Sequence, residues 1–227
     1  MKTVAIIQAR LGSTRLPYKM MLSLHGKPLI EWVIKRVQKS KKLDDIVVAI
    51  PISQENDILE NYINKLGIKV FRGSESNVLD RFYKAVKDTD FTHIVRVCAD
   101  NPLIYGNEID NLIEFYADNS CDYAYNHIPK DNLYPDGLGA EIISFELLKF
   151  LNENAVLQHH KEHCLSYIWD NKEKFTIKTF DPPNKKLHRV DVKLDVDTFD
   201  DYYKLSMKNF DINTSSEELI KLFGEIK

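Results

Sequence analysis

The sequence predicts an α/β fold with a mostly parallel sheet. Short apolar runs such as Val4-Ala5-Ile6-Ile7 are rich in β-branched residues and indicate strands buried on both faces, as in parallel sheets. Between these runs, apolar residues recur at helical spacing, and strands alternating with helices are the pattern of an α/β fold. The chain has 227 residues, enough for one domain over residues 1–227 with a sizeable core.

The elements follow one another in a regular order. The expected strands are Val4–Ile7, Ile46–Ile50, Ile68–Phe71 and the run Ile94–Ile104, which ends in an acid and a proline. The expected helices are Pro28–Val37, Asp57–Gly67 and about 215–222. Pro28 suits a first helical turn, where its missing N–H costs nothing, and Gly67 is a typical helix stop.

The late segment Lys193–Tyr202 alternates acids and apolar residues before a further helix. In a strand this alternation would put Asp195 and Asp197 on one face. Thr198 has the properties of an N-cap, and Asp201 three residues later makes an approximate capping box. From the residues alone, these acids are equally well explained as helix-start and solvent-facing groups.

A polar loop follows the first strand and suits an anion. It contains Gly12, the hydroxyl residues Ser13 and Thr14, and the cations Arg10, Arg15 and Lys19. A small residue lets backbone N–H groups approach phosphate oxygens, arginine offers forked donors, and lysine adds a point charge. Any one of these cations could be an ordinary solvated loop residue, but three converging cations favour a phosphate site. The common G-x-x-x-x-G-K-[ST] phosphate loop is not present, since Pro28 follows Gly26-Lys27.

Composition excludes several classes. The chain carries 31 basic and 34 acidic residues, without a basic stripe, which argues against nucleic acid as a partner. No apolar stretch is long enough for a signal peptide or a membrane span, so we expect a cytoplasmic protein without membrane insertion. The three cysteines are widely spaced and predict neither disulfides nor a structural zinc site.

The run Ala9–Lys19, followed by Gly26-Lys27-Pro28-Leu29, resembles the opening signature of cytidylyltransferases that make CMP-sugars. The similarity is greatest to the branch called spore coat polysaccharide biosynthesis protein F-like, related to CMP-KDO synthetases. It implies a three-layer αβα, Rossmann-like nucleotide-diphospho-sugar transferase fold. It also implies transfer of CMP from CTP to a sugar acid of the KDO or nonulosonic type, with release of pyrophosphate. This reaction would serve surface polysaccharide biosynthesis. Family members are often homodimers.

The resemblance assigns residues to the nucleotide. Those expected to bind it are Gln8, Ala9, Arg10, Gly12, Ser13, Arg15, Lys19, Arg72, Ser74 and Asp80. The last three would lie near the base, although Asp80 and Arg81 are equally well explained as a helical surface pair. The catalytic residues are expected to be Arg10, Arg15, Lys19 and Asp100.

Two aspartates are expected to bind Mg²⁺. Asp100 follows a strand beside the phosphate loop, and hard oxygen ligands suit a magnesium ion shared with phosphates, although Asp-Asn-Pro is also a common turn start. The resemblance favours the metal role for Asp100 and adds Asp197 as the second ligand.

The segment of about 121–145 resembles the acceptor-binding region of the family. The residues expected to bind the sugar acid are Asn126, Asp136, Glu141 and His163. The chain has Gly139 where the family pattern has an acid. His159 and His163 have metal spacing, but no third ligand is evident, and Glu162 with His163 resembles a family pair near the acceptor.

Two other functions fit part of the pattern. Asp195-Val196-Asp197 could be the Asp-x-Asp motif of a metal-dependent glycosyltransferase that uses a nucleotide-sugar donor. The cationic loop argues against it, because a triphosphate needs more cationic contacts than a diphosphate sugar. A nucleotide sensor without catalysis would keep the loop, but both expected metal carboxylates are present.

Overall fold

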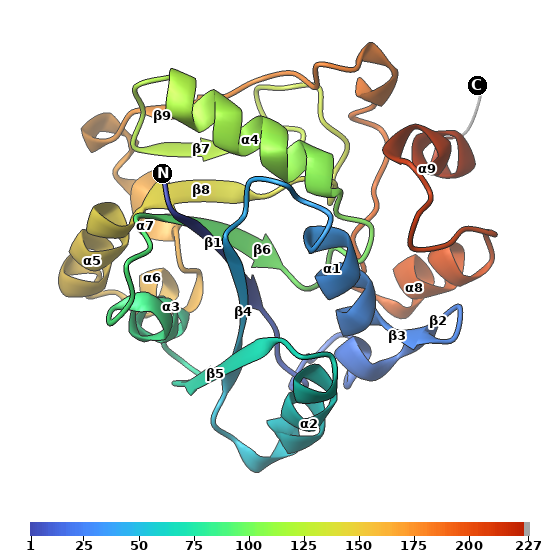
Figure 1. Ribbon diagram of the computed structural model, residues 1–227, viewed down its shortest axis with the longest axis horizontal. Helices are drawn as coiled ribbons and strands as arrows, with labels where there is room; N and C mark the ends of the chain where they lie inside the picture. The colour runs from blue at the N-terminus through green and yellow to red at the C-terminus, as the bar shows by residue number, and fades with distance from the viewer. Residues whose placement is uncertain (225–227) are drawn as a thin grey trace.

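Residues 1–224 are described by a computed structural model, in which a central sheet lies between two layers of helices (Figure 1). Within these residues the sheet has seven strands in the order β5-β4-β1-β6-β8-β7-β9. The strands are β1 (Thr3–Gln8), β4 (Asp45–Pro51), β5 (Lys69–Gly73), β6 (His93–Cys98), β7 (Tyr123–Tyr125), β8 (Glu141–Ser144) and β9 (Ile177–Thr179). Of these seven, β8 alone runs opposite to the others. The prediction of a mostly parallel, Rossmann-like α/β fold is therefore confirmed.

Each face of the sheet is covered by its own helices. One layer contains α1 (Leu29–Val37), α2 (Asp57–Lys65) and α4 (Gly106–Asp118). The other contains α3 (Val78–Val86), α5 (Phe145–Asn154), α6 (Gln158–Glu162) and α7 (Ser166–Asp170). Along β1, Ala5 and Ile7 face the first layer, whereas Val4 and Ile6 face the second. Both faces of the strand are buried, which explains its unbroken apolar sequence.

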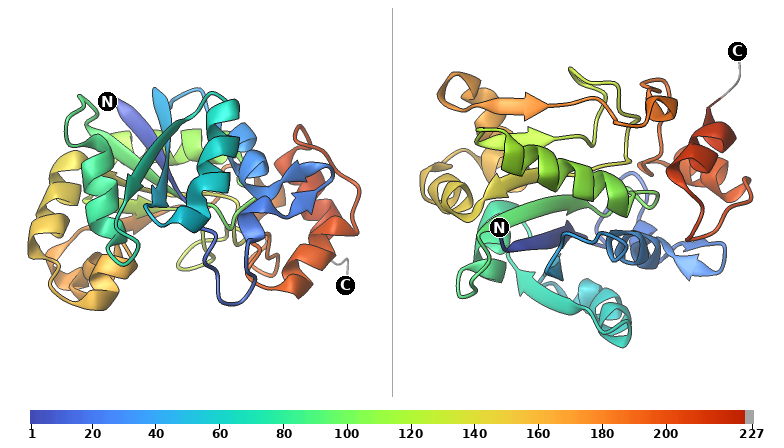
Figure 2. Two further views of the ribbon diagram at one scale, coloured as in Figure 1. Left: turned by 90° about the horizontal axis from the view of Figure 1, so that it is seen from below. Right: turned by 45° about the horizontal axis from the view of Figure 1, so that its top comes forward.

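The C-terminal part packs beside a small hairpin, at one side of the sheet (Figure 2). The hairpin is β2 (Ser23–Leu24) with β3 (Lys27–Pro28), and the helices beside it are α8 (Phe199–Ser206) and α9 (Ser216–Phe223). A third apolar cluster holds them together, and its members include Trp32 of α1 together with Leu194, Val196 and Leu205. Short 3₁₀ turns are η1 (Lys19–Met21), η2 (Gln54–Asn56), η3 (Lys172–Lys174) and η4 (Lys185–Leu187).

Local signals predicted several elements correctly. The strands and helices expected in the first hundred residues are found with shifts of a few residues, although the fourth strand ends earlier, at Cys98. The capping box of Thr198 and Asp201 is present at the start of α8. The segment around residue 121–145 supplies β7 and β8 of the main sheet. Within residues 1–224, no helix is long and apolar enough to cross a membrane.

The alternating segment before α8 does not form a strand. Lys193 makes one isolated parallel bridge to Asp136, and residues 194–197 belong to no strand. The alternation in burial is nevertheless present, because Leu194 and Val196 are buried in the third cluster while Asp195 and Asp197 stay partly exposed. Apolar packing, rather than a hydrogen-bonded ladder, fixes this segment.

Arg36 of α1 is buried and attaches the C-terminal part to the sheet layers. It donates hydrogen bonds to the carbonyl oxygens of Ile104, Ile212 and Thr214 at 2.8–3.1 Å. We expect Arg36→Met to lower the free energy of unfolding by about 2–4 kcal/mol, because buried carbonyls lose their donors. Urea denaturation measures this change. The control Lys35→Met, at a partly exposed neighbour, should change stability little, and equal losses in both variants would contradict the role of Arg36.

Candidate active site

Backbone hydrogen bonds hold the loop after β1 in place. Leu11 is buried, and its N–H donates to Oδ1 of the buried Asn56 at 3.0 Å. The loop closes where the N–H of Tyr18 donates to the Leu11 carbonyl at 3.1 Å, with Tyr18 in the left-handed region at φ 56°. Arg10 directly precedes Leu11, is exposed, and its side chain makes no hydrogen bond or ion pair with the described residues.

This loop forms one wall of a pocket of about 250 Å³. The pocket is lined by Gln8, Ala9, Arg10, Ser13, Thr14, Arg15, Lys19, Met20, Arg96, Cys98, Ala99, Asp100 and His163. It opens at the carboxyl ends of β1 and β6, where open α/β sheets bind their ligands. Burial raises the pKa of Cys98 to about 12, which favours the neutral thiol over the thiolate.

Lys19 joins the two acids expected to bind metal. Its Nζ lies 3.2 Å from Asp100 Oδ2 and 3.6 Å from Asp197 Oδ1, and it donates to the Val196 carbonyl at 2.9 Å. Arg15 Nη2 lies 2.8 Å from the same oxygen of Asp197. A further backbone bond, from Val196 N–H to the Asp100 carbonyl at 2.7 Å, holds the two segments together. The structure therefore brings Arg15, Lys19, Asp100 and Asp197 into one group.

The donor set of this group suits a magnesium ion. Asp100 and Asp197 offer carboxylate oxygens that already approach one cationic atom, Lys19 Nζ, and hard oxygen ligands are those that Mg²⁺ prefers. Other acids lie nearby. Burial, then the charges of Asp195 and Asp197, raise the pKa of Asp136 to about 6. This local excess of negative charge would be offset by a divalent cation.

Arg96 is a site residue that the sequence analysis missed. It lies on β6 between Gln8 of β1 and Glu141 of β8, and lines the pocket. Its Nε and Nη2 donate to Gln8 Oε1 at 3.4 and 3.2 Å, and its Nη1 donates to Glu141. The available signal was a lone charge inside the apolar run Ile94-Val95-Arg96-Val97, because such a charge must be paired when buried.

Glu141, expected to bind the acceptor, forms an ion pair with Arg96. Its other oxygen accepts a hydrogen bond from the Tyr123 hydroxyl at 2.6 Å, and the residue is buried. Burial favours the neutral acid, but the charges of Arg96 and His127 and the Tyr123 hydroxyl outweigh it and hold the pKa of Glu141 below its ordinary value. Glu141 therefore orients Arg96 from beneath the pocket.

The residues expected near the base lie outside this pocket. Arg72 donates to Asp57 and Glu60 at 2.6 Å and to the carbonyls of Ile52 and Ser53 at 2.9 Å. Asp80 of α3 pairs with Lys84 at 2.9 Å. Ser74 accepts from the backbone of Asn77 at 3.0 Å. With these partners, the three side chains stabilise β5 and the helices beside it.

Two other expected acceptor residues also have structural partners. Asn126 is fully buried, donates to the Glu108 carbonyl and accepts from the Ala140 N–H, both at 2.9 Å. A Cβ at Gly139 would overlap Asn126 Oδ1, which explains glycine where the family pattern has an acid. The backbone of Asp136 bonds to Val192 and Leu194, beside the acids described above.

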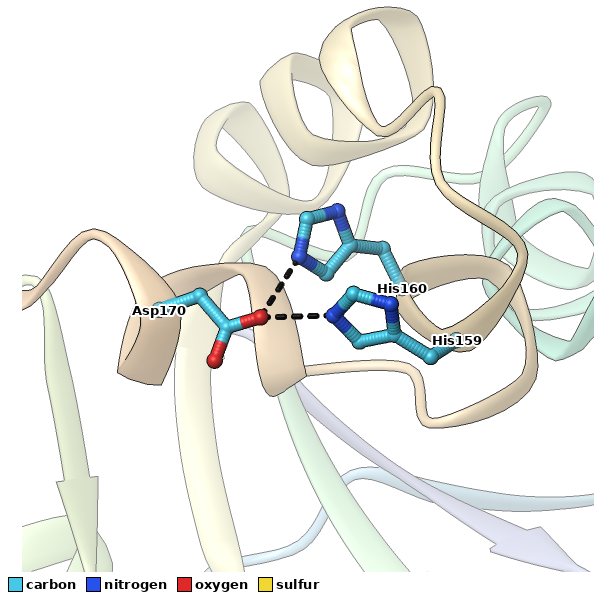
Figure 3. A group of neighbouring side chains, drawn as sticks. All are labelled: His159, His160 and Asp170. Carbon is cyan, nitrogen blue, oxygen red and sulfur yellow. Dashed lines mark hydrogen bonds and ion pairs between the residues drawn. The ribbon is translucent and has the colours of Figure 1, made fainter.

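The end of α6 places the histidines differently from the expected pair. His163 lines the pocket, and Glu162 beside it is exposed. His159 instead pairs with Asp170, which also contacts His160 (Figure 3).

Gly12 lies in the loop after β1, close to Glu55. A Cβ at this position would be 3.0 Å from Glu55 Oε1.

A Rossmann-like sheet that opens on a cationic loop and a pair of aspartates is the arrangement of a nucleotidyltransferase. The chain belongs to the cytidylyltransferase family, whose profile matches residues 4–225, and it is a CTP-dependent nucleotidyltransferase. The resemblance stated from its motifs is confirmed.

The chain is also similar to individual proteins in sequence and in structure. An uncharacterized protein of Methanocaldococcus jannaschii is 39% identical, over 97% of this chain and 89% of its own. The spore coat polysaccharide biosynthesis protein SpsF of Bacillus subtilis is 32% identical, over 96% and 92%. A 3-deoxy-manno-octulosonate cytidylyltransferase of Bdellovibrio bacteriovorus is 34% identical, over 74% and 62%. A cytidylyltransferase structure from Leptospira borgpetersenii has a TM-score of 0.87 at 30% identity, covering 98% of this chain and 93% of that one.

Arg72 provides a test of its two assignments. Because its partners belong to the protein, we expect Arg72→Gln to lower the free energy of unfolding by about 1 kcal/mol, a value typical of partly exposed ion pairs. The KM for CTP should stay within about twofold, since 1.4 kcal/mol would be needed for a tenfold change. Denaturation and steady-state kinetics measure both. A tenfold rise in KM at unchanged stability would instead support a contact with the base.

Glu141 provides a test of its buried ion pair with Arg96. We expect Glu141→Gln to lower the free energy of unfolding by about 3–5 kcal/mol at pH 7, because Arg96 would be left buried without its counter-charge. The pKa of Glu141 is lowered, so this contribution is present above pH 4.5 and is lost as the pH falls through the folded-state pKa. Denaturation over a pH series measures it, with the exposed Glu153→Gln as control. Equal stability of the two variants at pH 7 would contradict the pairing.

Proposed function

We propose that this protein transfers CMP from CTP to a sugar acid of the KDO or nonulosonic type, releasing pyrophosphate, for surface polysaccharide biosynthesis. The observation that carries the proposal is the set of ion pairs that joins Arg15 and Lys19 to Asp100 and Asp197. Arg15, Lys19 and Asp100 line one pocket, and Asp197 lies beside it through these contacts. The names of the relatives from Bacillus and Bdellovibrio support the class of product.

The loop would bind the triphosphate. Arg10 is without a protein partner in the described chain, and it can donate to phosphate oxygens directly. Arg15 is largely exposed and can turn from Asp197 to a phosphate. Lys19 is buried and fixed, so it supplies a preorganised charge near the bond that breaks. Together these cations would hold the β- and γ-phosphates and offset the charge of the departing pyrophosphate.

Asp100 and Asp197 would hold Mg²⁺. When bound, this ion would neutralise phosphate charge and polarise the phosphoryl group under attack. The two carboxylates stay close to each other through the backbone bond between Val196 and Asp100, so the site is preformed.

The acceptor would lie against Arg96 and His163. Three of the five N–H groups of Arg96 are used by Gln8 and Glu141 within residues 1–224, which leaves two for the carboxylate of a sugar acid. In the reaction, an acceptor oxygen forms a bond to the α-phosphorus, and the bond from that phosphorus to the bridging oxygen breaks. His163, which also lines the pocket, is the proposed base for the hydroxyl proton.

The family membership also bears on the other expectations. It does not support a glycosyltransferase, and Asp195 of the Asp-x-Asp pattern pairs with Lys193 at 3.4 Å rather than with the loop cations. We propose a cytoplasmic location, because CTP is a cytoplasmic metabolite, and no role for nucleic acid. A homodimer stays a prediction of the resemblance.

Substrate choice is tested by pyrophosphate release with Mg²⁺, each of the four nucleoside triphosphates, and a panel of sugar acids and sugar phosphates. We expect release with CTP and one sugar acid. Release with CTP and a sugar phosphate, but no acid, would keep the cytidylyl transfer and overturn the acceptor class. Cleavage of a nucleotide sugar to a nucleoside diphosphate would overturn the proposal as a whole.

The two aspartates are tested by Asp100→Asn and Asp197→Asn. We expect each to lower kcat by at least about 100-fold, the scale of losing one electrostatic group of a catalytic site, while the KM for CTP changes by only a few-fold. Steady-state kinetics at saturating Mg²⁺ measures both. Asp200→Asn, an exposed neighbour on α8, is the control. Wild-type turnover in Asp100→Asn would remove this residue from the proposed metal site.

A further inference from the structure

A second cluster of metal-ligand side chains joins α6 to α7 (Figure 3). His159 Nε2 lies 2.6 Å and His160 Nε2 lies 2.9 Å from the same oxygen of Asp170, Oδ2. One ligand atom from each residue lies within 4.8 Å of the other two. The cluster uses neither Asp100 nor Asp197, so it is separate from the proposed magnesium ligands.

The cluster combines one fixed ligand with two adjustable ones. His160 is 4% exposed, and its ring packs edge-on against Tyr167, with ring centroids 5.1 Å apart. The turn between the helices is closed by Ser166, whose N–H donates to the His163 carbonyl at 2.7 Å. His159 and Asp170 are about half exposed, which lets them shift toward an ion.

We propose that His159, His160 and Asp170 bind one divalent transition-metal ion such as Zn²⁺, through both Nε2 atoms and a carboxylate oxygen. Imidazole nitrogens favour such ions, whereas an all-oxygen pair such as Asp100 and Asp197 favours Mg²⁺. Three protein ligands leave a fourth tetrahedral position for water. The inference stands apart from the proposed function, because it does not depend on the substrate.

Geometry and desolvation both limit the affinity. Zinc–nitrogen bonds of about 2.0–2.1 Å in a tetrahedron separate ligand atoms by about 3.3 Å, so Asp170 must move outward slightly from its present contacts. Binding also places the ring proton on Nδ1, and Nδ1 of His160 is buried without a partner among the described residues. We therefore expect micromolar rather than nanomolar binding.

The experiment titrates the full chain, cleared of metal by a chelator, with Zn²⁺ in a calorimeter and with Co²⁺ in a spectrophotometer. Excess Mg²⁺ is present throughout to occupy the oxygen ligands. His159→Gln and Asp170→Asn change exposed residues and should leave the fold intact, which circular dichroism checks. Two controls are included. His163→Gln tests the alternative His159–His163 pair, and Asp100→Asn tests the oxygen site.

We expect one Zn²⁺ per wild-type chain and the visible absorption of four-coordinate Co²⁺. Affinity should fall in both His159→Gln and Asp170→Asn by at least the roughly 10- to 100-fold that loss of an outer partner of a metal ligand already costs. It should be retained in both controls. Absence of saturable binding, or wild-type affinity in both test variants, would overturn the proposal and leave a hydrogen-bonded cluster only. Loss in His163→Gln would also overturn it.

Discussion

The ammonium of Lys19, held between Asp100 and Asp197, is the contact on which the active site depends. A cation with 7% exposure must be paired, and its partners come from the end of β6 and from the C-terminal segment before α8. These segments are far apart in the chain. The apolar packing around Val196 and the hydrogen bonds of Arg36 bring the C-terminal part to the sheet, and Lys19 then fixes the two carboxylates at one point.

Charge pairing also applies to the pocket residue Arg96 on β6. In the described structure Arg15 and Lys19 neutralise the aspartates, whereas Arg96 is neutralised by Glu141. In the proposed reaction, the exposed Arg15 would turn from Asp197 toward a phosphate while the buried Lys19 stays in place, and the two carboxylates would hold Mg²⁺. Arg96 would keep Glu141 throughout, because that pair is buried and its carboxylate has a further donor in Tyr123.

The sequence predicted the parts of the fold that rest on local signals. The apolar run of β1 and the capping box of α8 are determined by residues next to each other, and both are found as expected. The alternation of acids and apolar residues before α8 did not reveal whether this segment is a strand, because alternation in burial arises equally from packing on a non-local apolar cluster. Arg96 was missed for a related reason. Its partner Glu141 lies 45 residues later, and only the strand order places the two side by side.

By itself, therefore, the sequence determined the class of fold, the cationic loop and the family, since these are carried by contiguous motifs such as Ala9–Lys19. Tertiary structure decided which polar residues share a pocket. Arg72 has the right chemistry for a nucleotide, yet its guanidinium is occupied by carboxylates of α2 and by carbonyls of the segment before α2. Asp100 and Asp197 converge through Lys19. The physical reason is that a charge is satisfied by whatever lies within a few ångströms of it, and chain folding, rather than sequence spacing, sets those neighbours.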